Sequence, residues 1–92
     1  MNLQNEKQEH ELLLKMRKNM RITGVKEVLS FDEQSVMLRT VSGELAIEGR
    51  ELRVGTLDTE LGVVTLEGRV CGIYYSDRAE DEKKGFFGKL LR

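Results

Sequence analysis

The stretch ELAIEGRELRV, residues 44–54, decides the fold, because apolar and polar residues alternate along it. Leu45 and Ile47 have one parity, which is typical of residues on one face of a strand. Leu52 and Val54, which come after Gly49-Arg50, have the other parity. A change of parity moves side chains to the opposite face of a sheet unless a bulge or a corner intervenes. The stretch therefore predicts a β-strand that is interrupted at Gly49-Arg50.

The same pattern returns at an offset of 19 residues. Val64 and Leu66 share a face, Gly68-Arg69 interrupts, and Cys71 and Ile73 follow on the opposite parity. Both copies read Gly-x₃-apolar-Glu-Gly-Arg-x₃-apolar, which makes a modest internal repeat. Cys71 falls at the position of Leu52, so we expect a small buried apolar side chain there. Glu48 with Arg50, and Glu67 with Arg69, are expected to form polar pairs at two solvated corners.

The distribution of residue types divides the chain into three parts. All valines, isoleucines and threonines lie between Ile22 and Ile73, and such β-branched side chains favour strands. We expect a polar N-terminal arm over residues 1–9 and a β-strand domain over 10–75. Residues 76–92 are expected to form a charged linker and a short amphipathic tail, flexible or helical.

The expected fold class is mainly all-β, a small antiparallel β-roll, barrel or sandwich of short strands. Hairpin connections are predicted at Asp32-Glu33-Gln34 and at Ser42-Gly43. The alternative is a short β-solenoid with about one repeat per coil. Five glycines are predicted to form structural turns, where positive φ angles are tolerated: Gly24, Gly43, Gly49, Gly62 and Gly68.

The first twenty residues are ambiguous. Leu13, Met16 and Met20 have helical spacing, and the Glu, Lys, Leu and Met content favours a helix. Leu12, Leu14 and Met16 alternate as in a strand. Both readings stay open on these residues alone.

No catalytic, cofactor-binding or metal site is predicted. The chain has one histidine, His10, and one cysteine, Cys71, which cannot build a His/Cys metal centre. Asp58 and Glu60 would share a strand face, which we expect to be solvated. The Gly-Arg units have neither the lysine of a P-loop nor the spacing of a Rossmann loop. We therefore expect a non-enzymatic protein with no cofactor.

Composition also restricts the compartment and the partners. The polar N-terminus lacks a secretory signal pattern, and a single cysteine suits a reducing compartment, so we expect a cytoplasmic protein. The net charge is −1, and residues 21–75 hold more acidic than basic side chains. No nucleic-acid partner is therefore expected.

The C-terminal segment is the most suggestive interaction element. Its apolar residues group beside basic ones, an arrangement typical of a segment that lies on a membrane surface or docks in a partner's groove. The residues of this interaction tail are Phe86, Phe87, Lys89, Leu90 and Leu91.

The order and spacing of motifs across residues 10–75 resemble the YabP/YqfC family of sporulation proteins. The motifs are HELLL at 10–14, Arg17, RITGV at 21–25, Val28, Phe31-Asp32, TVSGELAIEG at 40–49, Leu52, Leu57, Gly62, Glu67-Gly68 and IYY at 73–75. The ending GFFGKLLR at 85–92 is more similar to the YabP branch than to the YqfC branch. Arg53 departs from the histidine expected in many relatives.

This resemblance implies a structural protein of endospore formation, in spore-coat assembly on the mother-cell side, at the forespore surface. It implies no enzyme activity. The implied partners are other sporulation or coat proteins and further copies of the chain. The resemblance also implies that residues 10–16 pair as a strand, which brings strand and helix to even odds.

Overall fold

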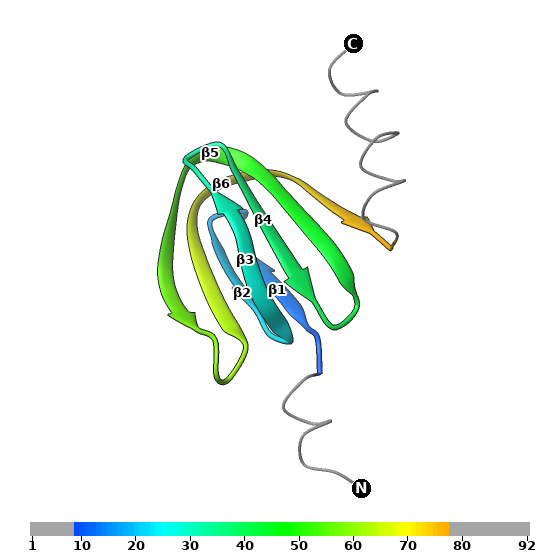
Figure 1. The fold of residues 1–92 in the computed structure, drawn as a ribbon. Coiled ribbons are helices and arrows are strands. Elements are labelled where there is room, and N and C mark those ends of the chain that lie inside the picture. The colour runs from blue at the N-terminus through cyan, green and yellow to red at the C-terminus, as the bar shows by residue number, and fades with distance from the viewer. Residues whose placement is uncertain (1–8, 78–92) are drawn as a thin grey trace, which may run out of the picture.

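The computed structural model describes residues 9–77, and this part of the chain contains six β-strands and no helix (Figure 1). The strands are β1 (Leu12–Lys15), β2 (Asn19–Ile22), β3 (Val25–Phe31), β4 (Ser35–Thr40), β5 (Gly43–Asp58) and β6 (Val63–Ser76). They form one sheet in the order β1-β2-β6-β5-β4-β3, and all neighbouring pairs are antiparallel. The all-β, antiparallel prediction is confirmed. The solenoid alternative is wrong, because the two repeats lie on adjacent antiparallel strands.

The sheet rolls because its two central strands are long and bulged. β5 has 16 residues and β6 has 14, and their pairing shifts register between Glu48 and Gly49, between Arg50 and Arg53, and between Val54 and Thr56. Each bulge adds local twist and bends the strand that carries it. β2 pairs with the first half of β6, whereas β4 pairs with the first half of β5. The bend therefore folds the β1-β2 side of the sheet over the β3-β4 side, as Figure 1 shows.

One hydrophobic core lies between the two sides of the roll. Its fully buried side chains come from β2, β4, β5 and β6, so each strand places alternate residues inward. They are Ile22, Val36, Leu38, Leu45, Ile47, Leu52, Val64 and Leu66. Burying a side chain of this size contributes about 1.5–3 kcal/mol, so this small set is the main stabilising element of the roll.

The parity change in β5 lies at Arg50-Glu51, one residue beyond the predicted interruption at Gly49-Arg50. Gly49 faces the buried Val70, and Leu52 is fully buried beyond the interruption. Glu51 has a φ of 52°, in the left-handed region that non-glycine residues rarely adopt. This local turn returns the following apolar residues to the core.

The parity change in β6 lies later than predicted. Val64, Leu66 and Val70 are all buried and all have even numbers. The alternation of inward and outward residues therefore continues through Gly68 without a break. The extra residue is Cys71, because Glu48 pairs with Gly72 and Gly49 with Val70. Cys71 is therefore exposed, and the expectation of a buried thiol was wrong.

Residues 12–15 are a strand, which decides between the two readings left open by the sequence. β1 and β2 form a hairpin in which Leu14 lies opposite Met20. Met16 and Arg17, at its turn, have φ angles of 56° and 57°. Two consecutive residues in the left-handed region characterise the hairpin turns that match strand twist. Glycine or asparagine usually marks such a turn, so the sequence gives no turn signal here.

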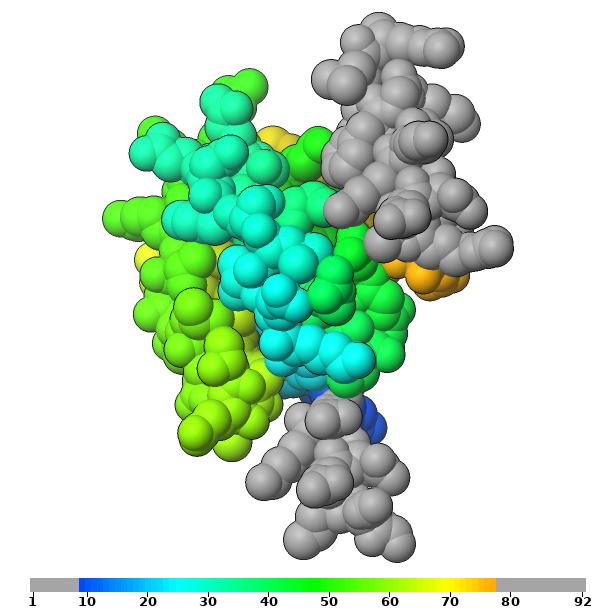
Figure 2. Space-filling model, in the orientation of Figure 1, coloured from blue at the N-terminus to red at the C-terminus, as the bar shows by residue number. Residues whose placement is uncertain are grey.

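The two predicted hairpin connections are present. Asp32 Oδ1 accepts hydrogen bonds from the amides of Gln34 (2.7 Å) and Ser35 (2.9 Å), which closes the β3–β4 turn. In the β4–β5 turn, the buried Thr40 hydroxyl donates to the Gly43 carbonyl at 2.7 Å and accepts from the Ser42 amide at 3.0 Å. In Figure 2 the β3–β4 hairpin, in cyan, forms the near surface of the molecule.

Candidate functional site

Three chain segments that are distant in sequence meet at one end of the roll, which we call the corner end. They are the β1–β2 turn at residues 16–18, the β3–β4 turn at 32–34, and the β5–β6 corner around Gly49-Glu51 and Gly68. Backbone hydrogen bonds join them: Gly49 N to Gln34 O (3.0 Å), Leu52 N to Glu33 O (2.9 Å), Gly68 N to Lys18 O (3.1 Å) and Val70 N to Arg17 O (2.9 Å). Because amides from β5 and β6 reach both turns, the corner end is a defined surface rather than a set of independent loops.

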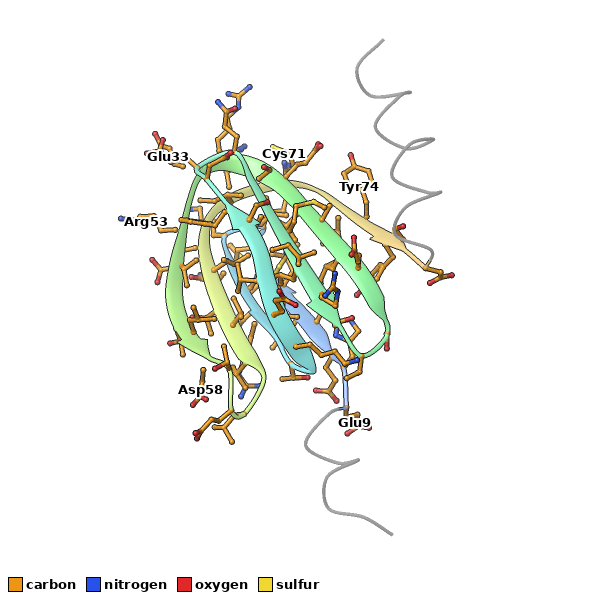
Figure 3. The ribbon with its side chains drawn as sticks, viewed as in Figure 1. Glu9, Glu33, Arg53, Asp58, Cys71 and Tyr74 are labelled. Atoms are coloured by element: carbon orange, nitrogen blue, oxygen red, sulfur yellow. The ribbon has the colours of Figure 1, made fainter. Side chains whose placement is uncertain are left out.

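Basic side chains gather at the corner end. A shallow cavity of about 490 Å³ lies there, lined by Lys18, Asn19, Arg50, Glu51, Arg53, Glu67, Gly68 and Arg69. Four of these residues are cationic and two are anionic. In Figure 3, Arg53 projects outward from β5, near the same end as Glu33 and Cys71. The cavity walls therefore carry an excess of positive charge.

The ion pairs at the corners differ from those predicted. Arg53 lies 3.6 Å from Glu67 on the neighbouring strand, and both side chains are exposed. Arg50 and Arg69 lie directly opposite one another across β5 and β6. Within residues 9–77, neither of these two arginines makes an ion pair. The offset repeat thus brings two like charges together rather than two Glu-Arg pairs.

The glycines expected at turns lie at both ends of the roll. Gly24, Gly43, Gly62 and Gly68 have φ angles of 72°, 117°, 73° and 130°. Gly49 does not have a positive φ, but a Cβ there would approach the Arg69 carbonyl oxygen closely. Gly49 therefore serves a close backbone approach at the corner rather than a left-handed turn.

The opposite end of the roll, which we call the far end, joins the N-terminal residues to the end of β6. His10 Nδ1 donates to the Thr23 carbonyl at 2.8 Å, and His10 Nε2 is hydrogen-bonded to the Tyr75 hydroxyl at 2.7 Å. The two rings are also in edge contact, with centroids 5.6 Å apart. Burial raises the pKa of the Tyr75 hydroxyl. His10 is thus bound to the Thr23 carbonyl and to the Tyr75 phenol, which ties the N-terminal residues to β6.

The remaining candidates for chemistry are separated from one another. Asp58 Oδ1 accepts from the Leu61 amide at 3.0 Å, so this carboxylate closes the β5–β6 turn. Glu60 lies in the turn itself, not on a strand face. No group of three or more His, Cys, Asp or Glu side chains within residues 9–77 could hold a metal ion. A search of the same residues finds no helix with the length and apolar character needed to cross a membrane.

The interaction tail, Phe86, Phe87, Lys89, Leu90 and Leu91, lies outside the described residues. Sequence reasoning missed Lys18 and Arg53 as members of the corner end. A signal was present for Lys18: the run Lys15-Met16-Arg17-Lys18 places three cations around one apolar residue. Only the hairpin brings that run next to the β5–β6 corner.

The rolled antiparallel sheet defines a small all-β protein with a charged corner end. Comparison with protein families is specific: the YabP family model matches residues 6–82. The chain is also 42% identical over 86 residues to the spore protein YabP of Bacillus subtilis (strain 168), an alignment that covers 92% of this chain and 86% of that protein. The chain belongs to the YabP family.

Proposed function

We propose that this chain is a non-enzymatic protein of endospore formation that acts in spore-coat assembly by binding other proteins. The observation that carries the proposal is the 42% identity, over nearly the whole chain, to a relative named as a spore protein. Membership of the YabP family supports the sporulation-related role. The work would take place in the mother-cell cytoplasm, at the forespore surface.

Other sporulation or coat proteins, and further copies of the chain, are the proposed partners. The roll is an open sheet, so β1 and β3 are edge strands with one unpaired side each. β3 carries two register shifts, which blunt an edge, whereas the pairing of β1 has none. Edge pairing through β1 is therefore the simplest route by which copies would associate.

Affinity capture from sporulating cells with the tagged full-length chain tests this function. We expect spore-coat or sporulation proteins to be enriched over a capture from vegetative cells that express the same tagged chain. Replacing Phe86 and Leu90 by serine tests the tail, with Lys83→Gln as a control that alters only the adjacent charged stretch. Capture of the same proteins in both cell states, with normal spores in a deletion strain, would refute the proposed function.

The alternative function is a peripheral membrane adaptor anchored by the C-terminal tail. The observation that favours it is the sequence of the tail, where Phe86, Phe87, Leu90 and Leu91 adjoin Lys89 and Arg92. Liposome pelleting of the tail variant separates the two functions. Loss of lipid binding without loss of captured proteins would favour the adaptor.

A further inference from the structure

The corner end concentrates most of the cations of the described chain. Besides Lys18, Arg50, Arg53 and Arg69 around the cavity, the β1–β2 hairpin carries Lys15 and Arg17 at its turn. Arg21, Lys26 and Arg39 lie elsewhere within residues 9–77, along β2, β3 and β4. The acids at the corner end, one fewer than its six cations, are Asp32, Glu33, Glu48, Glu51 and Glu67. The opposite end carries Glu9, Glu11, Asp58, Glu60 and Asp77.

The arrangement of these cations is unfavourable for the isolated fold. Arg50 and Arg69 occupy directly opposed positions on adjacent strands, where like charges are destabilising. The three non-glycine residues with positive φ in the described chain, Met16, Arg17 and Glu51, are all at this end. Strained backbone of this kind clusters where a surface serves binding. An anion placed between the two arginines would relieve the repulsion.

The second observation is an apolar side chain at the apex of the same surface. Met16 is 84% exposed at the tip of the β1–β2 hairpin, and Lys15, Arg17 and Lys18 surround it in sequence. The tip is fixed to the corner, because Arg17 Nε donates to the Val70 carbonyl at 3.0 Å. The Val70 amide donates back to the Arg17 carbonyl at 2.9 Å. The apolar apex and the arginine pair therefore belong to one rigid surface.

We propose that the corner end docks on an anionic lipid membrane, with phosphate headgroups around Arg50 and Arg69 and Met16 inserted between them. A headgroup layer accounts for both features, since it offers many phosphates in a plane and an apolar layer directly beneath. A soluble anion would account for the arginines but would leave Met16 in water. Guanidinium groups bind phosphate through paired hydrogen bonds, which suits them to this role. The inference is independent of the C-terminal tail and goes beyond the proposed role in coat assembly.

Vesicle sedimentation with the full-length chain tests the proposal. We expect binding to vesicles that contain phosphatidylglycerol, little binding to phosphatidylcholine alone, and release as salt is raised. Replacing Arg50 and Arg69 by glutamine should weaken binding about thirtyfold, at about fivefold for each cation near an anionic surface. Met16→Ser should weaken it about fivefold, as expected for a half-buried apolar side chain.

Charge-matched controls make the test decisive. Arg69→Gln and Lys26→Gln remove the same charge, but only the first lies at the corner end, so we expect about fivefold weakening against less than about twofold. Neither Arg50 nor Arg69 makes an ion pair within residues 9–77, so their replacement should not lower the melting temperature. Every variant retains the tail, so a tail-anchored protein would bind equally in all of them.

Four results would overturn the proposal, the last of them in a competition with free phosphate. The first is equal binding by the wild type and the Arg50→Gln/Arg69→Gln double variant. The second is equal binding to neutral and anionic vesicles. The third is binding of a poly-glutamate peptide without binding of anionic vesicles, which would assign the corner end to an acidic protein. Free inorganic phosphate should compete only weakly, and full competition at low concentration would assign the cavity to a soluble anion.

Discussion

The two ends of the roll are built from different turn chemistry. At the far end, positive φ angles fall on glycines, Gly24, Gly43 and Gly62, which adopt them without a steric penalty. At the corner end they fall on Met16, Arg17 and Glu51 as well as on one glycine. The far end thus has glycine at the positions where φ is positive. The corner end instead has charged and apolar residues at three such positions, where a positive φ is energetically unfavourable.

Long-range backbone bonds hold both ends in place, but within residues 9–77 they support non-glycine residues with positive φ only at the corner end. At the far end such bonds run from Val25 N to Gly62 O and from Val41 N to Gly24 O, and the Thr40 hydroxyl also closes its turn locally on the Gly43 carbonyl. At the corner end, long-range backbone bonds link β6 to the β1–β2 turn and β5 to the β3–β4 turn. Tertiary packing therefore stabilises a backbone conformation that local sequence disfavours, and the side chains retained there are cationic.

The largest effect is expected at the corner glycines. A Cβ at Gly49 would meet the Arg69 carbonyl oxygen, and Gly68 has a φ of 130° with the Glu51 carbonyl oxygen 2.5 Å from its Cβ position. Replacing both by valine should lower the free energy of unfolding by about 4 kcal/mol or more, or prevent folding. Thermal melts followed by circular dichroism measure this change.

Gly55→Val is the matched control for the corner substitutions. Its Cβ would lie 2.8 Å from the Thr65 hydroxyl oxygen, which belongs to a side chain that can rotate away. We expect a cost below about 1 kcal/mol. An unchanged melt of the double Gly49/Gly68 variant would show that β5 and β6 do not meet as closely as described.

The same contrast explains how far the sequence predicts the fold. Hairpins at residues 32–34 and 42–43 were predictable, because aspartate, serine and glycine mark them. The Met16–Lys18 turn was not, because its residues favour a helix locally, and the pairing of β1 with β2 together with backbone bonds from β6 holds them in a turn. The charged corners were predicted, but the opposition of Arg50 and Arg69 depends on strand register, which periodicity alone does not give.

At the far end, Tyr75→Phe should have a moderate effect. The change removes the hydrogen bond to His10 Nε2 and should lower the free energy of unfolding by about 1 kcal/mol. Burial raises the pKa of Tyr75 in the folded chain, so its neutral form is favoured there. The contribution of the neutral Tyr75 hydroxyl to folding stability is fully present below the pKa of the unfolded state. It is lost as the pH rises through the pKa of the folded state.

Melting temperatures of the wild type and Tyr75→Phe should therefore converge at strongly alkaline pH. The phenylalanine variant retains the ring contact with His10, so the difference reports on the hydroxyl group. A gap between the two proteins that stays constant from neutral to alkaline pH would contradict this account of Tyr75.

Relief of strain at the β1–β2 turn should give a smaller effect of opposite sign. Met16 has a φ of 56° and is 84% exposed, so its side chain contributes little to the core. Met16→Gly removes the left-handed penalty, about 1 kcal/mol, and adds some flexibility to the unfolded chain. We expect a net stabilisation of up to about 0.5 kcal/mol in denaturant titrations. Val28→Gly, at a position without positive φ whose side chain packs against the core, should instead destabilise.

The smallest effect is expected at Cys71, where the sequence-based prediction was wrong. Cys71 is the extra residue of the β6 bulge and its side chain is exposed, so Cys71→Ala opens no cavity. We expect a change in the free energy of unfolding within about 0.5 kcal/mol, as for other exposed positions. Val70, the adjacent residue, is only 4% exposed and packs in the core, so Val70→Ala should cost about 2 kcal/mol. Urea titrations of the two variants compare the exposed bulge residue with its buried neighbour. If Cys71→Ala cost as much as Val70→Ala, the bulge would lie at Gly68-Arg69, where the sequence pattern had placed it, and the thiol would be buried.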